Sequence, residues 1–287
     1  MTYISGYGNH AAQLMIIGDC PTERDVTTNK LFSDSRELDI LLRETGIVRN
    51  DCWLTSISKF HIPPNIKGKR IPFSIRAKHA GIDIQQQIYE LQAEVNEIKP
   101  NCILGLGKAV LWAFTGKDSI TNSRGSILQG MGRKFIPTYN PAHLNYQAAD
   151  TEFVGYYNRQ VILFDMNRAK AQSSFPEIQT PSRTLHVAKS SYDLYEFYER
   201  YKHLPNVSVD IEAGGHSLPI CIGLSFNPSH GITVPLWNKE GISSIPDADL
   251  ANCWILLANI LNKHGIIGKN FNYDRDKIRR LGFITPN

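Results

Sequence analysis

The sequence predicts an α/β protein of two domains, the first a four-stranded parallel sheet covered by helices and the second a mixed sheet. Before residue 171, four short apolar segments alternate with helix-like segments, which is typical of a parallel sheet. A stretch rich in Ser, Gln and Pro at 172–183 indicates a linker. Three adjacent strand-like segments then precede a helix, which favours a mixed sheet. We therefore expect domains at 1–171 and 184–287.

The composition is that of a folded protein long enough for two cores, with 287 residues of which 42% are hydrophobic. The formal net charge of +4 is mildly basic and compatible with a polyanionic partner. The five cysteines are odd in number and lack CxxC spacing, so we expect free thiols and no iron–sulfur cluster. The sequence shows no signal-peptide pattern and no apolar run near the roughly 20 residues of a membrane helix. We therefore expect a cytoplasmic protein without a membrane partner.

Hydrophobic patterning places the elements of the first domain. Apolar runs bounded by Gly, Pro or Asn predict strands, and apolar residues three and four apart predict helices. We expect Asp34 to cap a helix, with Glu37 three residues later and Gly46 ending it. The predicted strands are 13–17, 53–59, 102–106 and 135–138, and the predicted helices begin near 35, 85, 107 and 152.

A candidate cleft lies where these strands end, because ligands of open α/β sheets bind beyond the carboxyl ends of the strands. Asp19, the segment 56–64 and Asn140 fall there. The second of these loops continues into a basic run, which commonly means a solvated surface but beside a base pocket could contact a phosphate backbone. The candidate DNA-contacting residues of this run are Lys67, Lys69 and Arg70.

The second domain contains two carboxylates on a predicted strand. From 206 to 213 apolar and polar residues alternate, so Asp210 and Glu212 share one face. Two carboxylates at so short a distance favour the binding of a divalent cation, which prefers oxygen ligands. A polar strand facing water would show the same pattern. A third acid, Asp274, stands at a predicted helix start, where the helix dipole favours a carboxylate.

Three motifs of this domain occur in a recognisable order. They are Val-Asp-Ile-Glu at 209–212, Ile-Gly-Leu-Ser-Phe at 222–226 and Ile-Gly-Lys-Asn-Phe-Asn-Tyr-Asp-Arg at 267–275. Together they closely resemble the first two motifs of the 3′-to-5′ proofreading exonuclease domain of family A DNA polymerases, which has an RNase H-like fold. The resemblance runs from about residue 185 to the end of the chain.

This resemblance implies a two-metal site. Asp210, Glu212 and Asp274 would hold two Mg²⁺ or Mn²⁺ ions, and Asn270 would help to position a single strand. The ions would generate a hydroxide and stabilise the leaving 3′ oxygen. The third motif of the family would lie beyond Asn287, so we expect an incomplete site with weak or no exonuclease activity. We also expect the remainder of a polymerase chain as a partner.

The first domain carries five motifs that resemble the uracil-DNA glycosylase superfamily, and family 4 is the nearest type. The match runs from about residue 13 to residue 171. The motifs are Gly-Asp-Cys-Pro-Thr-Glu from 18, Leu-Phe at 31–32, Ile-Leu-Gly-Leu-Gly from 103, Arg-Gly at 124–125 and Pro-Thr-Tyr-Asn-Pro-Ala-His-Leu from 137.

The resemblance implies a pocket for a flipped base. Phe32 would stack on the base, unless it is a core residue that staples the following helix, and Asp19 would be the acid of the first motif. Ser56 stands where the family has an Asn that reads uracil, and Asn140 stands where it has a His. A neutral amide cannot supply the positive charge of that His, so we expect base excision to be crippled or absent. The iron–sulfur cysteines usual in family 4 are missing too.

The leading hypothesis is the N-terminal region of a phage-type family A DNA polymerase, acting in DNA replication and repair in an infected bacterial host. Its partner would be single-stranded or primer–template DNA. One alternative is an active uracil or modified-base glycosylase with an exonuclease-like appendage. Another is a non-catalytic module that binds or docks DNA.

Overall fold

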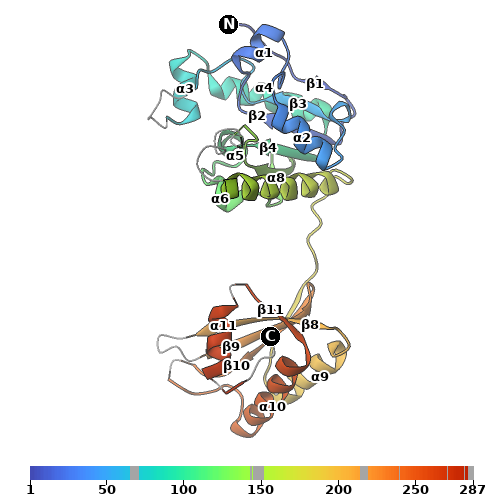
Figure 1. Cartoon of the computed structure of the whole chain (residues 1–287), viewed down its shortest axis with the longest axis vertical. Helices are drawn as coiled ribbons and strands as arrows, with labels where there is room; N and C mark the ends of the chain where they lie inside the picture. Colours follow the sequence, from blue (N-terminus) through green and yellow to red (C-terminus); the bar gives the residue numbers. More distant parts are fainter. Residues whose placement is uncertain are drawn as a thin grey trace. The chain divides into compact units, whose positions relative to one another are not determined.

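The computed structural model describes residues 1–64, 71–142, 144, 152–213, 219–238, 240–269, 271–280 and 282–283 (Figure 1). The chain divides into two compact units, Met1–Ile178 and Gln179–Asn287, each with its own sheet. Among the described helices, none has the length and apolarity needed to cross a bilayer.

The first unit contains a sheet of six described strands in the order β1-β3-β2-β4-β6-β5. The four central strands run parallel, as predicted, but β1 and β5 pair antiparallel at the two edges. The prediction of a four-stranded parallel sheet therefore holds for the centre and misses the two edge strands, which are too short to leave a periodic pattern. The strands are β1 (Tyr7–Gly8), β2 (Leu14–Gly18), β3 (Trp53–Ser56), β4 (Cys102–Leu106), β5 (Leu128–Gly130) and β6 (Arg133–Thr138).

Hydrophobic cores lie on both faces of this sheet. Met15 and Ile17 of β2 belong to the core shared with α3, α4 and α5, whereas Leu14 and Ile16 belong to the core shared with α2 and α8. Successive strand residues point to opposite faces, which explains the uninterrupted apolar run. The helices are α1 (Glu23–Thr28), α2 (Arg36–Glu44), the 3₁₀ turn η1 (Arg49–Asp51), α3 (Phe73–His79), α4 (Ile84–Ile98), α5 (Lys108–Thr115), α6 (Ile120–Ser123) and α8 (Glu152–Gln172).

The start of α2 differs from the prediction. The residue in the capping position is Ser35, and its side chain makes no capping hydrogen bond. Asp34, the predicted cap, instead forms an ion pair with Arg24 at 3.3 Å. Asp34 is thus paired with Arg24 of α1, although the local sequence alone predicts that it caps α2.

The second unit contains a mixed sheet, as predicted, with five described strands in the order β11-β8-β9-β10-β7. β8, β9 and β10 pair antiparallel, whereas β11 and β7 run parallel to their neighbours. The elements are β7 (Thr184–Val187), α9 (Ser191–Tyr201), β8 (Asn206–Ala213), β9 (Pro219–Asn227), β10 (His230–Pro235), α10 (Asp247–Lys263), β11 (Gly265–Ile267) and α11 (Asn272–Arg280).

One face of this second sheet packs against α9 and α10 (Figure 1). Val207, Val209 and Ile211 of β8 are buried in that core. The alternation along the strand therefore turns Asp210 and Glu212 away from the core, and both side chains are exposed. Helix α9 begins with a capping box, in which Ser190 and Asp193 satisfy each other's backbone N–H groups.

Candidate functional site

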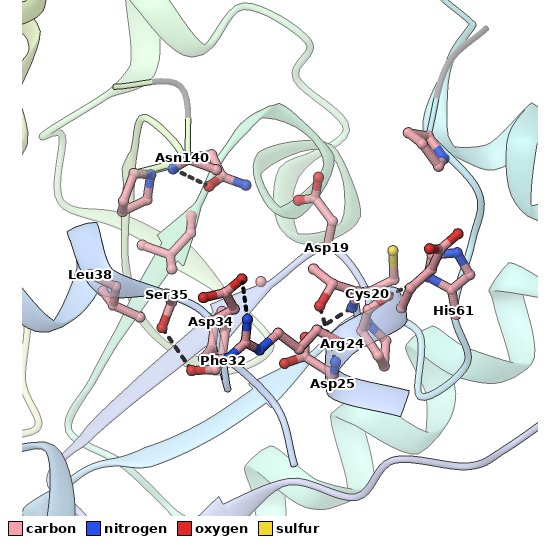
Figure 2. Close-up of a pocket in the computed structure, with 18 of the residues that line it drawn as sticks. Asp19, Cys20, Arg24, Asp25, Phe32, Asp34, Ser35, Leu38, His61 and Asn140 are labelled. Atoms are coloured by element: carbon pink, nitrogen blue, oxygen red, sulfur yellow. Dashed lines mark hydrogen bonds and ion pairs between the residues drawn. The ribbon is translucent and has the colours of Figure 1, made fainter. Parts of the chain in front are cut away.

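A cavity of about 670 Å³ opens at the carboxyl edge of the first sheet (Figure 2). Its walls come from the loop after β2 together with α1, from the start of α2, from the segment after β3 and from the turn after β6. The cavity lies where open α/β sheets bind ligands. Figure 2 shows Asp19 and Asn140 reaching into it from the ends of two different strands, with Phe32 on the side of α2.

Asp19 follows the last residue of β2 and brings a carboxylate into the cavity. Its Oδ1 atom is shielded from solvent and has no hydrogen-bond partner in the described part of the chain. Burial raises the pKa of this carboxyl to about 6, while the positive charge of Arg76 acts to lower it. A buried carboxylate oxygen without a partner costs stability, and acids with raised pKa values in cavities are candidates for functional groups.

Asn140 stands two residues beyond β6, and Gly107 lets it approach Asp19. Its Oδ1 accepts a hydrogen bond from Ala142 N at 3.0 Å, which holds the side-chain amide in place. A Cβ atom on Gly107 would lie 3.3 Å from Asn140 Cβ and 3.6 Å from Asp19 Oδ1. Gly107 also has a φ of +97°, a conformation that favours glycine. Gly107 therefore lies beside Asn140 and Asp19, which both line the cavity.

Phe32 supplies an aromatic surface to the same cavity. Its ring packs against Gly18, because a Cβ added to Gly18 would lie only 2.9 Å from Phe32 Cζ. Both Phe32 and Asp19 line the cavity. Phe32 thus lines the cavity and also packs against the core shared with α2 and α8.

The remaining charges of the cavity are mixed in sign. Arg76 of α3 donates from Nη1 to Pro63 O at 2.9 Å, and its buried Nε has no hydrogen-bond partner among the described residues. Burial raises the pKa of the Cys20 thiol to about 12, so this side chain is neutral and a poor nucleophile. The predicted DNA-contacting residues Lys67, Lys69 and Arg70 lie outside the described residues.

Ser56 ends β3 and is buried, and it is not among the described residues that line the cavity. Its hydroxyl donates to Ser58 O at 2.8 Å, and its carbonyl accepts from Lys59 Nζ at 3.1 Å. Its side chain is thus engaged with the protein itself. Gly107 shapes the cavity without having been predicted as a site residue, although a Gly directly after a buried strand was a visible signal.

The second unit brings its three predicted carboxylates to one region. Asp274 on α11 is buried, and its Oδ1 accepts a hydrogen bond from Ile211 N at 3.2 Å. Ile211 lies between Asp210 and Glu212, beyond Ser208, the last residue of β8 that pairs with β11. Asp274 therefore accepts a hydrogen bond from a β8 amide at a position where β11 no longer pairs with β8.

These carboxylates do not form a ready-made metal site. Within the described ranges, no group of three or more His, Cys, Asp or Glu side chains is arranged to hold an ion. Asp274 is engaged with the backbone, whereas Asp210 and Glu212 face outward. Asn270, predicted to position a single strand, lies outside the described residues. The five cysteines are free thiols.

Taken together, the parallel central strands and the cavity with its unpartnered acid define an α/β protein with a ligand pocket at the carboxyl edge of its sheet. The sequence profile of the uracil DNA glycosylase superfamily matches residues 5–161, which is more than half of the chain. The chain belongs to this superfamily, and the resemblance seen in the first domain is confirmed.

Two curated relatives extend this assignment. A type-4 uracil-DNA glycosylase of Thermotoga maritima is 29% identical over 173 residues, covering 58% of this chain and 81% of that protein. A DNA polymerase of Bacillus phage SP01 is 23% identical over 273 residues, covering 83% of this chain. That share exceeds the first unit, so the similarity reaches the second unit. The chain spans only 27% of the polymerase.

Proposed function

We propose that this chain acts on DNA in replication or repair, as the N-terminal region of a phage-type family A DNA polymerase. In this proposal the first unit binds a single unstacked base in its cavity. The observation that carries the base-binding role is the pairing of the Phe32 ring with the unpartnered Asp19 carboxylate in one cavity. The similarity to a phage polymerase across both units supports the wider role.

The cavity has the features that a flipped base requires. Proteins that extrude a base stack it on an aromatic side chain and contact its polar edge. Phe32 offers the aromatic surface, while Asp19 and Asn140 offer polar groups in the same cavity. A volume of about 670 Å³ is within the range of small-molecule sites and accommodates a nucleobase with its sugar.

The chemistry of the cavity favours binding over excision. Cleavage of a glycosidic bond leaves negative charge on the departing base, which a positive group would stabilise. Asn140 can donate a hydrogen bond from Nδ2 but remains neutral. Asp19 is an anion above a pH of about 6 and could orient a water molecule, but it cannot stabilise an anionic leaving group. We therefore propose that base release by this chain is slow or absent.

The test uses single-stranded DNA with one uracil and measures both binding and base release. We expect binding that weakens as salt rises, with little or no free uracil. The alternative of an active glycosylase is favoured by the unpartnered Asp19 and by the similarity to the T. maritima enzyme. Rapid uracil release that is lost in Asp19→Asn would establish that alternative and refute the binding-only proposal.

For the second unit we propose an exonuclease-related role with little activity in this chain. The hydrogen bond from Ile211 N, between Asp210 and Glu212, to Asp274 supports a single site for these three acids. Degradation of single-stranded DNA should stay near background with Mg²⁺ or Mn²⁺. Strong Mn²⁺-dependent degradation that disappears in the Asp210→Asn variant would contradict this proposal.

A further inference from the structure

The backbone of Phe32 adopts a conformation that a bulky residue avoids. Its φ is +53°, in the left-handed region, where a side chain with a Cβ atom is crowded. This conformation persists only where the surrounding structure enforces it. It also sets the direction of the Cα–Cβ bond that carries the ring toward Gly18. The groups that hold this backbone therefore decide where the ring lies.

Two distant residues hold the carbonyl groups of this turn. Arg49 Nη2 donates to Phe32 O at 3.0 Å, and Tyr7 OH donates to Leu31 O at 3.1 Å. Arg49 also donates to Tyr7 OH, from Nη2 at 2.7 Å and from Nε at 3.2 Å. Tyr7 belongs to β1 and Arg49 to η1, so the edge of the sheet anchors the turn between α1 and α2.

Neighbouring residues support the turn from within. Ser35 Oγ donates to Phe32 O at 2.8 Å. The buried Asp25 accepts from Ser33 N at 2.7 Å and from Ser33 Oγ at 2.8 Å. These contacts order the loop, but they come from the same segment. The contacts from Tyr7 and Arg49 are the ones that fix the loop relative to the sheet and hence relative to Gly18.

We propose that Tyr7 and Arg49 are positioning residues that lock Phe32 as a preformed platform for an unstacked base. This inference rests on the proposed base-binding function. Neither residue is among the described residues that line the cavity, so each acts through Phe32. A platform fixed before the ligand arrives spares the entropy of ordering it on binding, and removing the lock weakens base binding without removing any contact to DNA.

The experiment measures the affinity of the full chain for two single strands that differ only at one position, a uracil or an abasic site. The ratio of the two dissociation constants isolates the contribution of the base. Phe32→Ala should bring this ratio close to 1. Tyr7→Phe and Arg49→Gln should each reduce it about 3- to 10-fold, with Arg49→Lys in between because an ammonium cannot reproduce the fork of a guanidinium.

Matched control variants distinguish a positioning role from a general loss of stability or of DNA affinity. Tyr89→Phe removes the hydroxyl of an exposed tyrosine on α4, and Arg43→Gln removes an exposed cation on α2. Both should leave the ratio unchanged. Affinity for the abasic strand and its salt dependence should be the same in all variants, measured well below their unfolding temperatures. If Arg49→Gln fails to fold, Tyr7→Phe decides the question, because it removes a single oxygen.

The outcomes distinguish the two levels of the proposal. If Phe32→Ala abolishes the base-dependent ratio while Tyr7→Phe and Arg49→Gln behave like the unmodified chain, the positioning role is wrong and the base-binding function stands. If the unmodified chain shows no base-dependent ratio, or if Phe32→Ala leaves it intact, both are wrong. A reduced ratio in Tyr7→Phe with unchanged abasic binding supports the positioning role.

Discussion

At the scale of single residues, Asp19 combines a functional position with a cost in stability. Burial raises the pKa of its carboxyl from 3.8 to about 6, so the folded protein holds a proton that the unfolded chain has already lost. Between these two pKa values the stability of the fold decreases as the pH rises. The cost is fully present above a pH of about 6 and disappears below a pH of about 4.

The variant Asp19→Asn should therefore unfold less readily than the unmodified chain at alkaline pH. The expected gain is at most about 3 kcal/mol at pH 8 and about half of that at pH 5, since one pKa unit corresponds to about 1.4 kcal/mol. Urea denaturation at the two pH values measures both gains. An equal gain at both would show that the charge of Asp19 is not its source.

Gly18 is a second residue whose identity follows from a close approach. A Cβ atom there would lie 2.9 Å from Phe32 Cζ, so Gly18→Ala should displace the ring and destabilise the fold by about 1–3 kcal/mol. The base-dependent binding should fall as well. In a Phe32→Leu background the same substitution should cost less, because the ring that it meets is gone. If the losses of stability caused by Gly18→Ala and Phe32→Leu simply add in the double variant, a clash between the two residues is ruled out.

At the scale of elements, a buried ion pair joins the segment after β3 to α4. Lys59 Nζ lies 2.5 Å from Glu94 Oε2, and their side chains are only 3% and 14% exposed. The Glu94 carboxylate also accepts hydrogen bonds from Trp53 Nε1 and Thr55 Oγ1. Burial lowers the pKa of Lys59, and the charge of Glu94 opposes this effect. The pair orders the segment that leaves the sheet beside the cavity.

Glu94→Gln should destabilise the first unit by about 3–5 kcal/mol, because it leaves the buried Lys59 cation without its counter-ion. The double variant Lys59→Met/Glu94→Gln should recover much of that loss. Guanidinium denaturation gives both values. A matched exposed pair is Lys202 and Glu199, where Glu199→Gln should leave the stability nearly unchanged because solvent screens the two charges. Similar losses at the two pairs would contradict the role assigned to burial.

At the scale of the whole molecule, the end of the first unit lies beyond the predicted boundary at residue 171. Asn101 Nδ2 donates to Ser173 O at 2.8 Å. The buried Lys134 donates to Phe175 O and lies 3.7 Å from the centre of the Phe175 ring. Residues at the start of the predicted linker thus supply partners to the first unit, whose compact region extends to Ile178.

A fragment of residues 1–178 should therefore fold and keep the base-dependent binding of the full chain. A fragment of residues 1–171 should be less stable by about 3 kcal/mol, because Lys134 loses its carbonyl partner in a buried position. Thermal unfolding of the two fragments, read by circular dichroism, compares them directly. Equal unfolding temperatures would show that Phe175 contributes nothing to the first unit.

The sequence alone determined the elements whose signals are local. The central strands follow from their apolar runs, and the exposure of Asp210 and Glu212 follows from the alternation of side chains along β8. Ordered motifs were enough to indicate the superfamily. Short edge strands such as β1 and β5 escaped notice because two or three residues carry no period.

Only the tertiary structure decided which side chains meet. It packed Phe32 against Gly18, left Asp19 Oδ1 without a partner among the described residues, and engaged Ser56 with Ser58 away from the cavity. It also joined Tyr7 and Arg49, 42 residues apart, at the turn that carries Phe32. Sequence periodicity fixes the face on which a side chain lies. The pairing order of the strands and the burial of each carboxylate arise from long-range packing, which no local pattern encodes.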